Sequence, residues 1–422
     1  MDILILGAGV IGVTTAWRLA ERGHRVTVLE QRPGPGEGTS RANAGLVTPS
    51  QAPPWNEPGV PRQALGWLRE PDGALRIHPR AEPALWRWLL GFARHSRPRL
   101  HEAHARAILA LARHSRQELD RIAAATGIAY DRTDRGILTI ARDQASRGSI
   151  ERNAAKLQGL GIACSLLDRA GCLALEPALA PIERVVAGGL HTPEDASGDI
   201  YKLVTGLAEA AARRGVVFRT GVAVERLVPR SGRLAGVVAG GETLTADAYV
   251  LALGTGSASL ARQLGLRLPI YPVQGVSLTF DVPGWVQPPT MPVRDPLRRV
   301  ATTPMGGRLR VAGMAILNGG DLGIDRRDVD ALRRATAEIF PGAPLGRPAM
   351  EWSGLRPMTP DGPPIIGRTP FDNLLVNTGH GPLGWTLSCG SADVVADLVD
   401  GRAPAVPIEP FRIDRYRPGG IA

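Results

Sequence analysis

The stretch DILILGAGVIG, residues 2–12, opens the chain with an apolar strand that runs directly into the pattern Gly7-x-Gly9-x-x-Gly12. In this pattern Gly7 permits a tight turn, Gly9 lets the backbone approach a pyrophosphate, and Gly12 lets the next helix lie close to the strand. That helix offers unpaired N–H groups and the positive end of its dipole. A second apolar strand ends in Glu30, about 20 residues on, where an acid can bind a ribose hydroxyl. The sequence therefore predicts a dinucleotide-binding unit.

Length and composition set the class of protein. A chain of 422 residues exceeds one ordinary domain, and its 44% hydrophobic content is that of a globular protein with a large core. No apolar run approaches the length of a membrane-spanning helix. The first strand begins so early that we expect no signal peptide, and hence a cytoplasmic protein.

Charge and cysteine content exclude other classes. The net charge is +10, but the chain has only two lysines and its arginines are scattered, so we expect no nucleic-acid partner; weak attraction to an anionic membrane surface stays open. The three cysteines, Cys164, Cys172 and Cys389, form no C-x-x-C pair. They predict neither a disulfide framework nor a metal site.

Apolar periodicity and glycine placement indicate the order of elements. Residues 51–80 contain several prolines and look irregular. The patterns predict helices at 81–126, 146–160, 198–213, 327–338 and 384–400, with strands at 136–140, 216–219, 223–227 and 249–253 and hairpins at 233–246 and 299–313. The dinucleotide fold is thus assembled from separated pieces. We expect residues 1–50, 195–262 and 353–422 to form it, and residues 51–194 and 263–352 to form a second domain, with a ligand cleft between them.

Three further segments are candidates for chemistry. Residues 39–45 (TSRANAG) are small and polar, which suits close approach to a planar group. An ordinary loop with no binding role can have the same composition. Residues 352–367 place Arg356 in a rigid, Pro-flanked segment, where a guanidinium can bind a carboxylate with two parallel bonds. Residues 377–386 (NTGHGPLGWT) place three glycines before a helix, whose N-terminus can stabilise negative charge on a reduced flavin. His380 in this segment is either functional or a structural histidine.

Taken together and in this order, the four segments resemble the D-amino-acid dehydrogenase small-subunit type, within the FAD-dependent D-amino-acid oxidase family. The most specific matches are ANAG (42–45), GLRPMTPDG (354–362) and GHGPLGWT (379–386), of which Pro382 departs from the pattern; smaller ones are Pro54-Trp55, 58–61, Tyr271-Pro272 and 313–315. The resemblance covers nearly the whole chain. It implies an α/β fold, with a Rossmann-type, glutathione-reductase-like FAD domain and a second domain of antiparallel sheet and helices.

The resemblance also implies a set of site residues. The catalytic candidates are Arg356, which falls where relatives such as glycine oxidase hold the substrate carboxylate, with His380 and Tyr271. The residues implied to hold FAD are Gly7, Gly9, Val10, Ile11, Gly12, Glu30, Gln31, Arg32, Ser40, Asn43, Ala44, Gly45, Leu46, Val222, Gly254, Gly256, Gly354, Gly381, Pro382, Leu383, Gly384, Trp385 and Thr386.

The activity implied is oxidative deamination of a D-amino acid, with hydride transfer from Cα to flavin N5 and electrons passed to an acceptor such as a membrane quinone, which would bring the protein to the inner membrane face. No Cys lies near Gly354, where sarcosine-type oxidases attach flavin, so we expect non-covalent FAD. Gln274 replaces the family's common Lys, Val276 an aromatic residue, and Pro382 a Thr, and these changes leave the substrate side chain open. The alternatives are an enzyme for cyclic or N-substituted amino acids (D-hydroxyproline, D-proline, glycine or sarcosine), an NAD-dependent enzyme, and a non-catalytic FAD protein.

Overall fold

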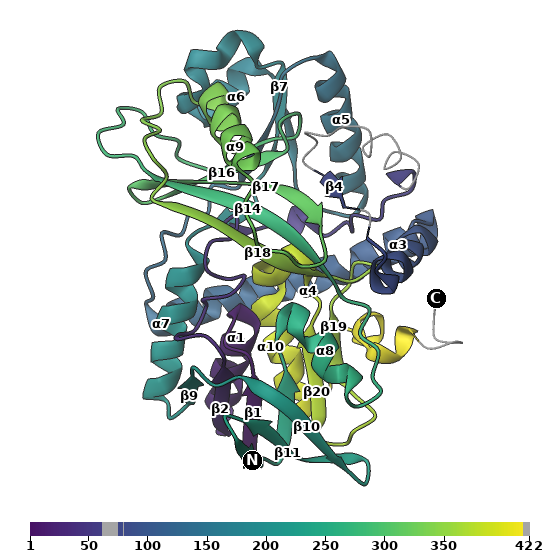
Figure 1. Cartoon of the computed structure of the whole chain (residues 1–422). Helices are drawn as coiled ribbons and strands as arrows, with labels where there is room; N and C mark the ends of the chain where they lie inside the picture. Colours follow the sequence, from purple (N-terminus) through teal and green to yellow (C-terminus); the bar gives the residue numbers. More distant parts are fainter. Residues whose placement is uncertain (61–74, 79, 417–422) are drawn as a thin grey trace.

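The computed structural model describes residues 1–60, 75–78 and 80–416. Two sheets dominate the fold (Figure 1): a mainly parallel six-stranded sheet in the lower half of the view and a mainly antiparallel nine-stranded sheet in the upper half. The α/β class and the second, sheet-containing part agree with the sequence-based prediction.

The first sheet has the strand order β19-β20-β13-β1-β2-β9, and all neighbours are parallel except β19 and β20. Its strands are β1 (Asp2–Leu6), β2 (Arg25–Glu30), β9 (Val217–Thr220), β13 (Ala248–Leu251), β19 (Ile365–Arg368) and β20 (Leu374–Thr378). The central strand β1 pairs with β2 on one side and β13 on the other. The chain thus diverges at the carboxyl end of β1, which is where open α/β sheets bind ligands.

Alternating residues of β1 bury both faces of this sheet. Ile3 and Ile5 pack in the cluster formed with α1 (Val10–Glu21), α4 (Pro98–Thr126), α7 (Ile200–Arg213) and α10 (Gly384–Val399). Leu4 and Leu6 pack on the opposite face, against the three-stranded meander β10 (Val224–Arg230), β11 (Arg233–Ala239) and β12 (Glu242–Leu244) and against α8 (Ser257–Arg262). Burial on both faces explains why this strand reads as a continuous apolar run.

The second sheet has the order β18-β14-β17-β16-β15-β5-β7-β6, with β4 beside β17. Its strands are β4 (Leu75–Ile77), β5 (Ile137–Ala141), β6 (Ser165–Leu167), β7 (Gly188–Thr192), β14 (Tyr271–Asp281), β15 (Val293–Asp295), β16 (Val300–Met305), β17 (Arg308–Leu317) and β18 (Met350–Met358). Val276, Leu278 and Phe280 pack in the cluster that includes α9 (Arg326–Ile339). The alternate residues of β14, Gly275 and Ser277, therefore face the other way, into a cavity.

The remaining elements connect these layers. The helices are α3 (Pro83–His95), α5 (Gln144–Gly159) and α6 (Arg169–Leu175), and β3 (Leu46–Val47) pairs with β8 (Ala196–Ser197). The 3₁₀ turns are η1 (Pro49–Gln51), η2 (Pro177–Val185), η3 (Gly254–Gly256), η4 (Gly381–Leu383), η5 (Glu409–Phe411) and η6 (Ile413–Tyr416). In the part of the chain that the structure describes, no helix combines the length and apolarity needed to cross a bilayer.

Three features differ from the sequence-based expectations. The helix expected over 81–126 is two helices, because Pro98 begins α4 after a break at residues 96–97. The domain boundary expected between residues 352 and 353 falls inside β18, which pairs with β14 along its whole length. Residues 75–77 form a strand within the stretch expected to be irregular, while residues 61–74 and 79 of that stretch lie outside the described residues.

Candidate functional site

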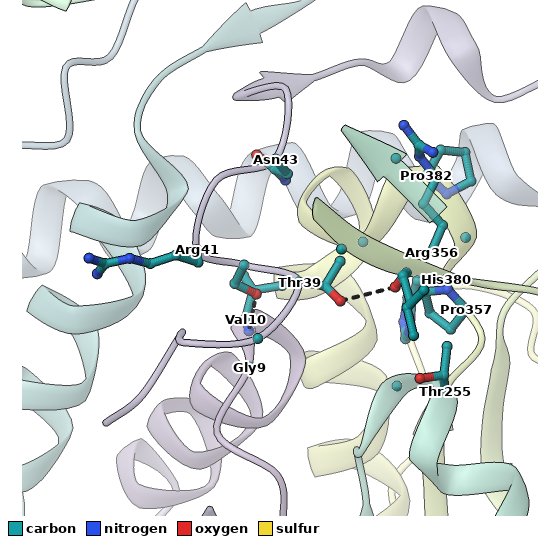
Figure 2. A pocket seen from close by; sticks show the side chains of 18 of the residues that line it. Gly9, Val10, Thr39, Arg41, Asn43, Thr255, Arg356, Pro357, His380 and Pro382 are labelled. Atoms are coloured by element: carbon teal, nitrogen blue, oxygen red, sulfur yellow. Dashed lines mark hydrogen bonds between the residues drawn. The ribbon is translucent and has the colours of Figure 1, made fainter. Parts of the chain in front are cut away.

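A cavity of about 1370 Å³ lies between the two sheets and draws its lining from the whole length of the chain. Figure 2 shows Gly9 and Val10 at the start of α1 and the 39–43 loop on one side, with Arg356, His380 and Pro382 across from them. Of the residues that the resemblance implied, those lining the cavity are Gly7, Gly9, Val10, Ile11, Glu30, Gln31, Arg32, Ser40, Asn43, Ala44, Leu46, Val222, Gly254, Gly256, Gly354, Arg356, His380, Gly381, Pro382, Gly384 and Trp385.

The glycine turn after β1 leaves backbone exposed at the cavity. Gly7 has a φ of +107°, and its N–H donates to the Leu29 carbonyl at 2.8 Å, which ties the turn to β2. Gly9 is the N-cap of α1 and has no side chain to cap the helix N-terminus, where the Val10 N–H donates to the Ser40 hydroxyl. Gly12 lies beneath the turn rather than in the cavity, because a Cβ there would lie 1.8 Å from the Gly7 carbonyl oxygen. Its role is thus to bring α1 close to the strand.

Glu30 lies at the carboxyl end of β2 with its carboxylate fixed from two sides. One oxygen accepts from the Ala8 N–H and the other from the Arg32 N–H, both at 2.9 Å. The Val222 N–H donates to the Glu30 carbonyl at 2.9 Å, so the Val222 segment follows the same edge. A carboxylate held in this way can still accept bonds from ribose hydroxyls, since each oxygen has a further lone pair.

The loop at 39–46 is fastened to the second sheet through its carbonyls. Ser277 donates to the Ala42 carbonyl at 2.6 Å and Thr303 to the Ala44 carbonyl at 2.7 Å. The Ser40 hydroxyl accepts from the Val10 N–H at 3.0 Å, which leaves the hydroxyl proton to donate elsewhere. Gly45 points away from the cavity, because a Cβ there would meet Met305 and the Gly198 carbonyl.

The C-terminal glycine segment leads into η4 and then α10, whose N-cap residue, Leu383, gives no side-chain hydrogen bond. Leu383 is buried, and the Thr386 hydroxyl accepts from the Thr48 N–H at 2.9 Å, so neither side chain lines the cavity. Two buried polar atoms in the lining, Trp385 Nε1 and Asn377 Oδ1, lack a hydrogen-bond partner among the described residues.

Arg356 extends from β18 across β14. Its Nη1 donates to the Gln274 carbonyl at 3.3 Å and to the Met314 carbonyl at 3.0 Å, and the guanidinium carbon lies 5.9 Å from the Trp55 ring centre. Among the described residues it has no carboxylate within 4 Å. Burial lowers its pKa to about 10, so the group remains charged at neutral pH. This cation can receive a carboxylate on its remaining N–H groups.

His380 and Tyr271 have different surroundings. His380 lines the cavity but is buried, its Nε2 lies 3.3 Å from the Ser391 hydroxyl, and burial lowers its pKa to about 3. It is therefore neutral at physiological pH. Tyr271 lies outside the cavity lining: it packs beside Trp88 with ring centres 6.0 Å apart, and its hydroxyl donates to Glu82 at 3.2 Å. The apolar cluster around Trp88 takes this side chain away from the cavity.

Several lining residues escaped the sequence-based reasoning. Ser277, Arg294 and Ala312 come from three strands of the second sheet. Ser277 lies on the face of β14 that borders the cavity, and no local signal in the sequence indicates this. Nothing in the sequence around Arg294 distinguishes it from the many other arginines of the chain.

The donor set fits FAD. The exposed backbone at Gly9 and the positive end of the α1 dipole suit a pyrophosphate, and Glu30 suits a ribose. The start of α10, whose N-cap gives no side-chain bond, suits the polar edge of a flavin together with the unpartnered Trp385 and Asn377 atoms. None of the three cysteines lines the cavity, so non-covalent binding stays the prediction.

Comparisons with known proteins agree with this geometry. Residues 2–398 match the family model described as FAD dependent oxidoreductase. The chain is 45% identical to a D-amino acid dehydrogenase of Methylobacterium nodulans, over 99% of both chains, and 43% identical to one of Allorhizobium ampelinum, over 100% of both. Among solved structures, glycine oxidase from Geobacillus kaustophilus superposes with a TM-score of 0.77 at 25% identity over 99% of both chains. The chain therefore belongs to the family of FAD-dependent oxidoreductases.

Proposed function

We propose that this protein catalyses the oxidative deamination of D-amino acids to 2-oxo acids and ammonia. The observation that carries the proposal is Arg356, a partly buried cation without a carboxylate partner among the described residues, held over the cavity by two backbone carbonyls. The names of the similar proteins from Methylobacterium nodulans and Allorhizobium ampelinum support the same activity.

In this proposal the side chains of the cavity hold the substrate in position for the reaction. Arg356 binds the substrate carboxylate, and the glycine at position 275 gives the guanidinium room to lie flat over β14. With the carboxylate fixed, the Cα–H bond has few orientations left, and positioning of this kind lowers the barrier by several kcal/mol. Bound FAD would supply the hydride acceptor for this oxidation. Neutral His380 lines the site and can form hydrogen bonds there. We assign no side chain as a base, because the substrate reacts in the form whose amine is already neutral.

The acceptor in this proposal is a quinone, reached at a membrane surface. Trp86 and Leu90 lie one turn apart on α3 with 55% and 53% of their surfaces exposed, and Arg87 and Arg94 are exposed on the same helix. Exposed apolar side chains beside cations favour the interface of an anionic membrane. Co-flotation with anionic vesicles tests this; a protein that floats equally well after Trp86→Ser and Leu90→Ser would argue against α3 as the contact.

A second candidate is oxidation of glycine or of cyclic or N-substituted amino acids, favoured by the similarity to glycine oxidase. Loss of the flavin absorbance near 450 nm, measured without oxygen after adding each amino acid, distinguishes the two candidate functions. D-Amino acids with a primary amine should bleach it, and bleaching restricted to D-proline, D-hydroxyproline, glycine or sarcosine would favour the second candidate. A protein that stays colourless with added FAD would contradict both.

A further inference from the structure

A second arginine lines the same cavity on a different strand. Arg294 lies in the middle of β15 and is partly buried. Within the described residues its guanidinium has no hydrogen bond and no carboxylate oxygen within 4 Å. Burial lowers its pKa. Removing a cation from water without a direct partner costs free energy, and a ligand of opposite charge would offset that cost.

The register of the sheet places Arg294 on the face that borders the cavity. Ser277 of β14 is opposite Ala312 of β17, which is opposite Ala301 of β16, which is opposite Arg294. Directly opposite residues share a face of a sheet, and all four line the cavity. Because the two residues between Ser277 and Arg294 are alanines, no large side chain of that row separates Arg294 from the space above β14.

The separation from Arg356 suits a small dicarboxylate. The Arg356 guanidinium is bonded to the Gln274 and Met314 carbonyls and thus lies over β14 and β17. From there to β15 is two to three strand spacings, about 10–14 Å, with a further offset of about 7 Å along the strands between Met314 and Ala312. The backbone of Arg294 is then about 12–16 Å away, and its side chain can reach back over the alanines. A four- or five-carbon diacid with a guanidinium at each end spans such a gap.

The nearby carboxylates are already engaged. Asp195, whose charge acts on Arg294, accepts bonds from the Ser50 N–H at 3.1 Å, the Ser50 hydroxyl at 2.5 Å and the Thr192 hydroxyl at 2.6 Å. Asp295 accepts from Arg142 at 2.5 Å. Neither forms an ion pair with Arg294 within 4 Å. The charge of Arg294 is therefore left for a ligand.

Building on the proposed function, we propose that Arg294 binds the side-chain carboxylate of the substrate while Arg356 binds its α-carboxylate. The enzyme accordingly favours acidic D-amino acids, D-aspartate and D-glutamate, over neutral ones of the same shape. The proposal names Arg294 as a specificity-determining residue, and it leaves the deamination chemistry unchanged.

The test compares each acid with its amide in the FAD-loaded enzyme. D-Glutamate and D-glutamine, like D-aspartate and D-asparagine, differ in charge but hardly in size. We expect the wild type to favour the acid in kcat/KM by at least about tenfold, and Arg294→Leu to lower the acid-to-amide ratio by about tenfold to a hundredfold, the usual range for a charge-assisted contact. Arg298→Leu is the matched control, because Arg298 is exposed, pairs with Glu338 and does not line the cavity.

Binding without turnover gives a second readout. Glutarate and butyrate differ by one carboxylate, and flavin difference spectra report their dissociation constants. Tighter binding of glutarate that depends on Arg294 supports the proposal, and Arg294→Gln serves if the leucine variant is insoluble. An acid-to-amide ratio near one in the wild type, or one that Arg294→Leu leaves unchanged, overturns the role of Arg294 alone. Failure of every D-amino acid to bleach the flavin overturns the proposed function instead.

Discussion

A Cβ added at Gly275 would lie 2.5 Å from both terminal nitrogens of Arg356. The guanidinium thus occupies the space that the side chain of any residue other than glycine would fill at position 275. The backbone of β14 therefore sets the position of a side chain from the neighbouring strand β18. We predict that Gly275→Ala displaces Arg356 and lowers kcat/KM for D-amino acids by about tenfold or more, as expected for losing a charge-assisted contact. Gly342→Ala, where nothing lies within 4 Å of the added carbon, should leave kinetics unchanged. Normal kinetics in Gly275→Ala would argue that the guanidinium is not needed in this position.

Removing the cation itself should separate substrate binding from cofactor binding. Arg356→Ala is expected to raise KM by about tenfold to a hundredfold, since a charge-assisted pair contributes about 1.5–3 kcal/mol. The visible flavin spectrum should persist, because Arg356 borders the cavity from the second sheet. Steady-state kinetics with flavin occupancy measured in parallel decides the matter. Near-normal KM in this variant would remove Arg356 from the site.

Two glycines of the N-terminal turn should respond differently to alanine. At Gly9 the nearest atom to an added Cβ is the Ser40 hydroxyl at 3.7 Å, so Gly9→Ala should fold but bind FAD more weakly. At Gly12 the added carbon would collide with the Gly7 carbonyl, so Gly12→Ala should lower thermal stability even without cofactor. Melting temperatures of the two apoproteins, with FAD titrations, test this contrast. Equal losses of apoprotein stability would contradict it.

The depressed pKa of His380 predicts a pH dependence of stability. The folded state holds the pKa at about 3, while an unfolded imidazole titrates near 6.5. Unfolding therefore takes up a proton between these values, and the free energy of unfolding falls with falling pH, by about 1.4 kcal/mol per unit below pH 6.5. Denaturant unfolding of His380→Asn should show a shallower slope from pH 6.5 to 4. If wild type and variant have the same slope, the buried imidazole does not set it.

The reduced enzyme should react slowly with oxygen and faster with a quinone. Neither lysine lines the cavity in the described part of the chain, and a lysine near the flavin is one common aid to oxygen reduction. Stopped-flow reoxidation by air-saturated buffer and by a soluble quinone gives the two rates. Rapid reoxidation by oxygen would identify an oxidase, with an arginine of the lining in the place of the lysine.

Much of the architecture could be read from local signals. The turn at residues 7–12 carries its own geometric requirements, and the alternation in the 299–313 segment predicted the antiparallel pair β16 and β17. The break at Pro98 could also have been predicted, because proline favours the first turn of a helix.

The rest depended on contacts between distant residues. Tyr271 belongs to a motif of the family, yet the apolar cluster with Trp88 takes its side chain away from the cavity. Gly45 and Thr386 likewise serve the packing of the loops, through Met305 and the Thr48 N–H. Arg294 is recognisable only when four strands are aligned in register. Contacts between residues so far apart in the sequence cannot be predicted from any single segment.

The packing of α10 against α1 ties the beginning of the chain to its end. The Thr14 hydroxyl of α1 donates to the Ser388 carbonyl of α10 at 3.2 Å, and Asn377 of β20, the strand before α10, donates to the Thr15 hydroxyl at 3.1 Å. During synthesis the glycine turn emerges from the ribosome first, yet its supporting helix arrives more than 370 residues later. The face of α1 that packs against α10 cannot be covered until then, so we expect the cofactor site to be completed only after α10 has been synthesised.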